Sequence, residues 1–213
     1  MNVYELDADF DTRSYVRGVW SIDQSHDSII KEGAWKARRQ SRLHEDGRLF
    51  AEDISKYQTH WLVVNVCPLP ELHIIGEFNT FRTGFPVVNQ KLRDALERVN
   101  PGGFEFVEIT QVWAEKQACL VPGGPFYVTN LLTERDTWDE KSTEIYKIKH
   151  VDGHDVERID GTKKTVRSSA LHGATIWRES RTGHVLCTEP VKQQLEEAGC
   201  RGWKFRPVHI SEN

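Results

Sequence analysis

Two stretches of the chain, residues 85–109 and 184–210, share one pattern of apolar and polar positions. Each begins with a short apolar run, continues with apolar residues at helical spacing, reaches a stop that contains glycine, and ends in an alternating run. The helical positions are Leu92, Ala95, Leu96 and Val99 in the first stretch, and Val191, Leu195 and Ala198 in the second. A spacing of i, i+3, i+4 and i+7 places apolar side chains on one face of a helix.

The flanking residues support the same interpretation. Asn89 and Thr188 stand at the expected helix starts, where their side chains can accept hydrogen bonds from free N–H groups. Gly102 and Gly199 stand at the expected ends. We therefore predict two similar strand–helix–strand units. The two strands of each unit should be neighbours in one sheet, because a short connection usually joins neighbouring strands. Chance similarity between two amphipathic helices that end at glycine is the alternative.

Further apolar runs predict strands, listed here by range: 61–67, 72–76, 126–132, 145–148 and 174–177. Asp152-Gly153 follows one of them and is typical of a hairpin turn. Before residue 60 the apolar pattern is poor, and we expect loops with one short helix. The prediction is an α+β fold with mixed sheets, with an irregular segment 1–60 packed on a main domain of residues 61–213.

Composition narrows the class of protein. The 213 residues are 38% hydrophobic and 28% charged, with seven Trp and nine Phe, which suits a globular core. No apolar run approaches the roughly 20 residues that span a bilayer. The net charge of −4 argues against nucleic acid as a ligand and suits a basic partner. The four cysteines have no C-x-x-C spacing, as expected of a reduced cytoplasmic protein without a metal or cofactor.

The densest charged stretch is residues 133–142, which places a tryptophan among carboxylates. An exposed tryptophan in a charged setting is typical of an interface hot spot. The candidate partner-binding residues are Glu134, Asp136, Trp138, Asp139 and Glu140. The alternative is a loop in which the aspartates bond their own backbone and Trp138 is folded inward.

One other cluster has residue types suited to catalysis. The candidate metal-site residues are His150, Asp152, His154 and Asp155. Two histidines four apart share a helix face, as metal sites use, but Gly153 and the flanking strand patterns favour a hairpin turn here. No G-x-S-x-G, phosphate loop or H-E-x-x-H motif is present.

Two segments carry a resemblance to a known family. Residues 126–132 followed by Asp136 to Ser142 resemble its pattern of a strand, an Asn, two apolar residues and D-x-x-D-x-x-S. Residues 176–178, with the strand and helix that lead to 202–208, resemble its C-terminal signature. The family is the eleventh immunity-protein family of bacterial polymorphic toxin systems. Trp138 and Cys187 depart from its usual residues, which are smaller apolar residues and Ser.

The resemblance implies a cytoplasmic antidote to a toxin delivered by type VI secretion or a similar route. It also implies that the toxin is a nuclease-type effector that the antidote binds directly, and it implies no catalytic residues. The rival hypothesis is a metal-dependent enzyme that reverses a toxin product or acts on a small molecule. A small-ligand sensor is a third possibility, and the sequence leaves the oligomeric state open.

Overall fold

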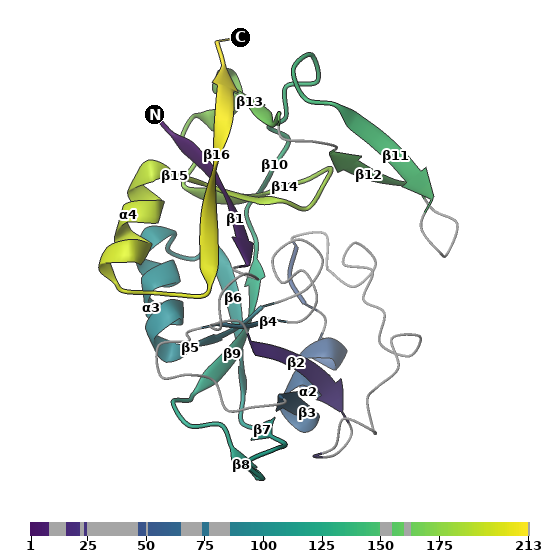
Figure 1. Ribbon diagram of the computed structural model, residues 1–213, viewed down its shortest axis with the longest axis vertical. Coiled ribbons are helices and arrows are strands. Elements are labelled where there is room, and N and C mark those ends of the chain that lie inside the picture. Colours follow the sequence, from purple (N-terminus) through teal and green to yellow (C-terminus); the bar gives the residue numbers. More distant parts are fainter. Residues whose placement is uncertain are drawn as a thin grey trace.

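The computed structural model describes residues 1–8, 16–21, 24, 47–49, 51–64, 74–76, 86–149, 155–159 and 163–212. Strands dominate, with three α-helices in this part of the chain, so the α+β prediction with mixed sheets is confirmed. Figure 1 shows two large sheets, a pair of helices along one side, and a separate hairpin. Among the described helices none combines the length and the apolar character needed to cross a membrane.

The first sheet has six strands, and the N-terminal strand lies inside it. The order is β10 (Glu134–Arg135), β14 (Ile176–Glu179), β15 (Val185–Thr188), β1 (Val3–Ala8), β16 (Trp203–Ser211) and β13 (Thr165–Arg167). Strand β1 pairs antiparallel with both β15 and β16. The two faces of β1 lie against different apolar clusters. Val3, at an odd position, packs in the smaller cluster, and Leu6, at an even position, packs in the larger one.

The second sheet has eight strands. Their order is β6 (Phe104–Ile109), β9 (Phe126–Leu131), β5 (Val87–Asn89), β4 (Ile74–Gly76), β2 (Val16–Ser21), β3 (Trp61–Val64), β7 (Val112–Ala114) and β8 (Cys119–Leu120). Every residue of β9 is buried, as expected of a continuous apolar run. The predicted strands near 61, 74 and 126 are present, although residues 65–73 lie outside the described part.

Before residue 60 the one short helix that we expected is present in the described part, but the expectation of loops around it is wrong where β1 and β2 form. This region supplies β1, β2 and helix α2 (Ala51–Thr59). Strand β1 was missed because both of its faces are covered and one buried position is the charged Glu5. Apolar and polar residues therefore do not alternate along it as they do along a half-exposed strand. The first sixty residues contribute a strand to each large sheet.

Each of the two patterned stretches contains a strand, a helix and a strand. The first is β5, α3 (Gln90–Val99) and β6, and the second is β15, α4 (Glu189–Glu197) and β16. The prediction that the two strands of each unit are neighbours is wrong. Strand β9 lies between β5 and β6, and β1 lies between β15 and β16. Each inserted strand runs antiparallel to both neighbours, which gives it ladder bonds on both sides.

The helices follow their sequence patterns closely. The four stripe residues of α3 are all buried, as are Val191 and Leu195 of α4. Asn89 caps α3, since its Oδ1 accepts a hydrogen bond from the Leu92 N–H at 3.1 Å. Thr188 stands at the start of α4 but makes no side-chain cap bond. Helices α3 and α4 contact one another beside the sheets (Figure 1).

The remaining elements are a hairpin and a short helix. Among the described strands, β11 (Ile145–Lys149) and β12 (Asp155–Ile159) pair only with each other, as the Asp-Gly signal indicated. A 3-10 helix, η3 (Ser168–Leu171), follows β13. The six-stranded sheet separates the main apolar cluster from a smaller one, hereafter the small core. The buried residues of the small core are Val3, Trp138, Val166, Leu171, Trp177, Leu186 and Val208.

Candidate functional site

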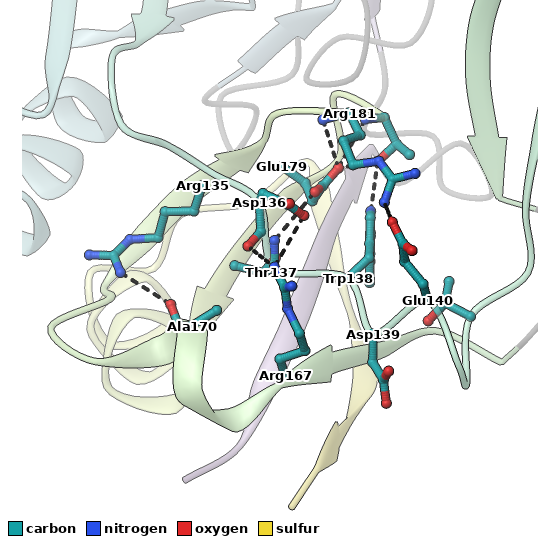
Figure 2. Close-up of polar contacts among 12 residues, drawn as sticks. Arg135, Asp136, Thr137, Trp138, Asp139, Glu140, Arg167, Ala170, Glu179 and Arg181 are labelled. Carbon is teal, nitrogen blue, oxygen red and sulfur yellow. Dashed lines mark hydrogen bonds and ion pairs between the residues drawn. The ribbon is translucent and has the colours of Figure 1, made fainter. Parts of the chain in front are cut away.

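The charged stretch that the sequence singled out closes the six-stranded sheet into a ring. Its start, β10, pairs in parallel with β14 at one edge of that sheet. A few residues later the chain bonds to β13 at the opposite edge, where Asp139 N–H donates to the Thr165 carbonyl at 2.9 Å and Arg167 N–H donates to the Thr137 carbonyl at 2.8 Å. We call residues 134–140 the closing segment (Figure 2). It passes over the small core and joins the two edges.

Trp138 points inward from the closing segment. None of its side chain is exposed, and it is among the largest fully buried side chains of the described residues. The indole Nε1–H donates to Thr182 Oγ1 at 2.9 Å, and the ring meets the His184 imidazole edge-on at 5.7 Å between centroids. This is the inward-folded alternative that the sequence left open. Trp138 does not present the exposed surface that a partner contact needs.

Glu179 is the buried acceptor that fixes the turn after β14. Its Oε2 accepts hydrogen bonds from Thr182 N–H and Oγ1–H, both at 2.9 Å, and from the Arg181 N–H at 3.0 Å. Its Oε1 receives the Thr137 N–H of the closing segment at 3.4 Å (Figure 2). Burial raises the pKa of Glu179, and these hydrogen bonds oppose that rise.

His184 continues this network toward the N-terminal strand. Its Nδ1 lies 2.8 Å from Thr182 Oγ1 and its Nε2 lies 3.3 Å from Glu5 Oε1. Lys164 bonds the other oxygen of Glu5. The single hydroxyl proton of Thr182 goes to Glu179, so the hydroxyl oxygen accepts from Trp138 and from an Nδ1–H of His184.

This Thr182–His184–Glu5 chain contains the residue types of a nucleophilic triad, but its geometry does not match one. Each side chain is buried, and the hydroxyl proton points to Glu179 rather than to the imidazole. The network therefore holds the closing segment and β1 against the sheet. Sequence reasoning missed it because Glu5 and His184 are far apart in the chain and no motif links them.

The outer side of the closing segment carries exposed carboxylates. Glu134, Asp136 and Glu140 are exposed, whereas Asp139 is buried with Trp138. Asp139 accepts hydrogen bonds from Lys141 N–H at 3.1 Å and Ser142 Oγ at 3.0 Å, and the first of these contributes most to lowering its pKa. Three of the five predicted contact residues thus lie on the surface, and two support the turn.

Two arginines tie the exposed carboxylates to neighbouring elements. Arg167 lies 3.3 Å from an Asp136 carboxylate oxygen and donates to the Asp136 carbonyl at 2.6 Å. Arg181 bonds Glu140 through Nη1 and Glu157 of β12 through Nε, the latter at 2.6 Å. The carboxylates stay open to solvent, because the side chains of Asp136 and Glu140 are 53% and 70% exposed.

The rival metal site falls largely outside the described residues. His150, Asp152 and His154 are not described, and Asp155 is exposed and pairs with Lys149 at 3.3 Å. Across the described ranges, no group of three or more His, Cys, Asp or Glu side chains is placed to hold a metal ion. The described residues therefore include all five predicted partner-binding residues, but only Asp155 of the four candidate metal-site residues.

Comparison with known families places nearly the whole chain in one of them. The family model "Immunity protein family (Imm11)" matches residues 2–209, and the chain belongs to that family. The match includes β1 and most of β16, so it extends over both large sheets. No curated protein matches the chain. The family suggests an immunity protein with a toxin partner and a role that is not enzymatic.

Proposed function

We propose that this member of the immunity protein family is an antitoxin that neutralises a cognate secreted bacterial toxin by binding it directly. The family match over residues 2–209 is the observation that carries the proposal. In this proposal the toxin is a nuclease-type effector delivered by type VI secretion or a related route, and the complex forms in the cytoplasm. The chain itself performs no chemistry on the toxin or on its product.

The closing segment supplies the charges for this contact. Glu134, Asp136 and Glu140 are exposed on its outer side. A nuclease binds phosphate through a basic surface, which is complementary to clustered carboxylates and to the net charge of −4. Complementary charge accelerates encounter and suppresses wrong partners more than it adds affinity. These three residues therefore steer the toxin toward the ring.

The buried network supports the same proposal through rigidity. Trp138 and Asp139 fix the closing segment from beneath, and Arg167 and Arg181 fix its carboxylates from the sides. A surface that is ordered before binding avoids the entropy cost of ordering loops on contact. Their role in the proposal is to hold the contact surface rather than to touch the toxin.

The test is a binding and protection assay with the product of the neighbouring gene. A catalytically inactive form of that product serves for titration calorimetry, and the active form serves for cell survival. We expect a tight one-to-one complex and full protection. Reversing two exposed charges, Glu134→Lys with Glu140→Lys, should weaken binding about tenfold or more at low salt.

A matched control is available on the other side of the molecule. Glu196 and Glu197 are exposed on α4, which packs in the main apolar cluster, whereas the closing segment covers the small core on the other face of the six-stranded sheet. Glu196→Lys with Glu197→Lys makes the same change in net charge. That variant should bind as the unmodified chain does. Equal losses from both variants would contradict a local contact at the closing segment. Survival of cells without any complex would refute direct binding and favour enzymatic reversal.

A further inference from the structure

The two strand–helix–strand stretches are equivalent in strand register as well as in sequence pattern. An alignment without gaps that places Gly103 on Gly202 also places α3 on α4, β5 on β15 and β6 on β16. The inserted strands correspond too, because Tyr127 of β9 and Tyr4 of β1 pair with aligned residues on both sides. The paired residues are Val88 and Glu108 for Tyr127, and Cys187 and Pro207 for Tyr4. Each unit therefore presents one tyrosine at the same place beside its helix.

In the second unit, Tyr4 lies in a cluster that contains its own ion pair. The Tyr4 hydroxyl donates to Oε2 of Glu189, the first residue of α4. Lys192 Nζ lies 4.5 Å from the centroid of the Tyr4 ring and 3.8 Å from Glu189 Oε1. The Phe205 ring meets the Tyr4 ring edge-on, with 6.3 Å between centroids. The hydrogen bond from Tyr4 contributes most to lowering the pKa of Glu189, so the cation of this unit has a carboxylate partner at neutral pH.

The first unit repeats this cluster at the aligned positions. The Tyr127 hydroxyl donates to Oε1 of Gln90, the first residue of α3, at 2.6 Å. The Arg93 guanidinium carbon lies 4.4 Å from the centroid of the Tyr127 ring and 5.5 Å from the centroid of the Phe106 ring. These two rings meet edge-on, with 6.4 Å between centroids. The alignment matches Gln90 with Glu189, Arg93 with Lys192, and Phe106 with Phe205.

An exchange of an amide and a carboxylate distinguishes the two clusters. In the second unit the Glu189 carboxylate accepts a hydrogen bond from the Gln193 amide at 3.3 Å, one helical turn further along. In the first unit the amide comes first, and Gln90 Nε2 donates to Asp94 Oδ1 at 2.6 Å. The carboxylate of the first unit therefore lies one turn away from the residue that receives the tyrosine hydroxyl, and it is bonded to an amide.

Arg93 consequently keeps its ring contacts without a carboxylate. Among the described residues, none forms a hydrogen bond or an ion pair with its guanidinium, including Glu108, which is exposed on β6 opposite Tyr127. A guanidinium has five N–H donors in one plane, and a ring against its face leaves the donors at its edge for a planar carboxylate. The described first turn of α3 contains no acidic residue to offset the partial positive charge of that helix end. Geometry and charge thus both favour an anion beside Arg93.

We propose that the Arg93 guanidinium, held over Tyr127 and Phe106, binds a carboxylate from another polypeptide in the place that Glu189 occupies in the second unit. The source of the carboxylate is an acidic side chain of the cognate toxin or of a second copy of the chain. Only the toxin as source rests on the proposed antitoxin function. Helix α3 packs in the main apolar cluster, so this contact is separate from the closing segment, which covers the small core.

The first experiment replaces sodium chloride by sodium acetate at constant ionic strength and follows the arginine Nε–H signals of the free chain by NMR. We expect the Arg93 signal to shift at least about threefold more than the Arg98 signal, because a guanidinium held by rings loses less freedom on binding. Arg98 is a matched control, since it is exposed on the same helix and its Nε–H donates to the Asp94 carbonyl at 3.2 Å. Gln90→Glu introduces the carboxylate that the second unit has, and it should abolish the Arg93 response.

The second experiment uses Gln90→Glu to identify the source of the carboxylate. If the toxin supplies it, the variant should bind the inactive toxin about tenfold more weakly. If a second copy supplies it, self-association of the free chain, measured by light scattering, should weaken instead. The urea midpoint should stay within about 0.3 M of the unmodified value, because the second unit accommodates a glutamate at this position. Gln194→Glu, exposed on α4, adds the same charge and should change neither association.

The outcomes separate this inference from the antitoxin function. An Arg93 response no larger than that of Arg98, or one that persists in Gln90→Glu, would overturn the site. A response to acetate with unaltered toxin affinity and unaltered self-association would overturn its use by a protein partner. Failure of the unmodified chain to bind the toxin would refute the antitoxin function, whereas the acetate titration would still decide whether Arg93 binds a carboxylate.

Discussion

Replacing Trp138 by alanine is the sharpest test of how the closing segment is held. The side chain has no exposed surface, and its Nε1–H donates to Thr182 Oγ1 at 2.9 Å. A tryptophan buries roughly 200 Å² of side-chain surface, which corresponds to about 5 kcal/mol at about 25 cal/mol per Å² as an upper value. Measured losses for Trp→Ala in cores are about 3–5 kcal/mol.

The hydrogen bond changes that value little, because Thr182 keeps its bonds to Glu179 and His184 when the indole is removed. We therefore expect Trp138→Ala to lower the free energy of unfolding by about 4 kcal/mol. Trp138→Phe keeps most of the ring and loses the N–H donor, so its cost should be about 1–2 kcal/mol. The expected order of stability is Trp, then Phe, then Ala.

Urea denaturation followed by circular dichroism measures both variants. With a slope near 2–3 kcal/mol per molar, the alanine variant should unfold at about 1.5 M lower urea. Trp138→Phe should keep its toxin affinity within about threefold, because the ring does not reach the surface. An alanine variant with an unchanged midpoint and lost toxin binding would refute this account and make Trp138 a contact residue.

Three further predictions follow from local geometry. The hydrogen bond from Arg181 contributes most to lowering the pKa of Glu157, so this carboxylate stabilises the fold above its ordinary pKa, and that contribution is lost as pH falls through the lowered pKa. Glu157→Gln should accordingly make the fall of the urea midpoint between about pH 6 and about pH 3 shallower than in the unmodified chain. Asn89→Ala removes the bond that caps α3 and should cost about 1 kcal/mol in denaturation, whereas Thr188→Ala removes no cap bond and should cost less. Burial raises the pKa of the Cys187 thiol, so peptide mapping after an iodoacetamide pulse should find it unlabelled in the folded chain and labelled in urea. Labelling in the folded state would contradict its burial.

Patterns within a few residues were enough for the helices and for several strands. The apolar stripe of α3 and the apolar run of β9 can each be recognised from ten residues or fewer, and both are buried in the structure. Such patterns are informative because a helix or strand buries residues at a fixed spacing whatever it packs against. Strand β1 lacks such a pattern, because it lies between two covered faces and includes the buried Glu5.

Sequence reasoning placed five contact residues in one charged stretch and was unable to separate those on the surface from those beneath it. The local composition of residues 133–142 is the same whether Trp138 points in or out. Its direction is set by Thr182, 44 residues away, and by β13, which pairs with the closing segment. Tyr146 and Ile148 alternate with lysines as apolar residues do on many half-buried strands, yet both are exposed in the structure.

Residues close together in the chain are sufficient to predict the α+β class, both strand–helix–strand stretches and the resemblance to an immunity-protein family. Tertiary packing, in contrast, inserts β9 and β1 between the strands of those stretches. It alone joined the two sheet edges through the closing segment and brought Glu5 to His184. Those contacts connect residues more than a hundred positions apart or elements whose order in the sheet differs from their order in the chain. Their stability comes from burial and hydrogen bonds that form only when the whole ring is assembled.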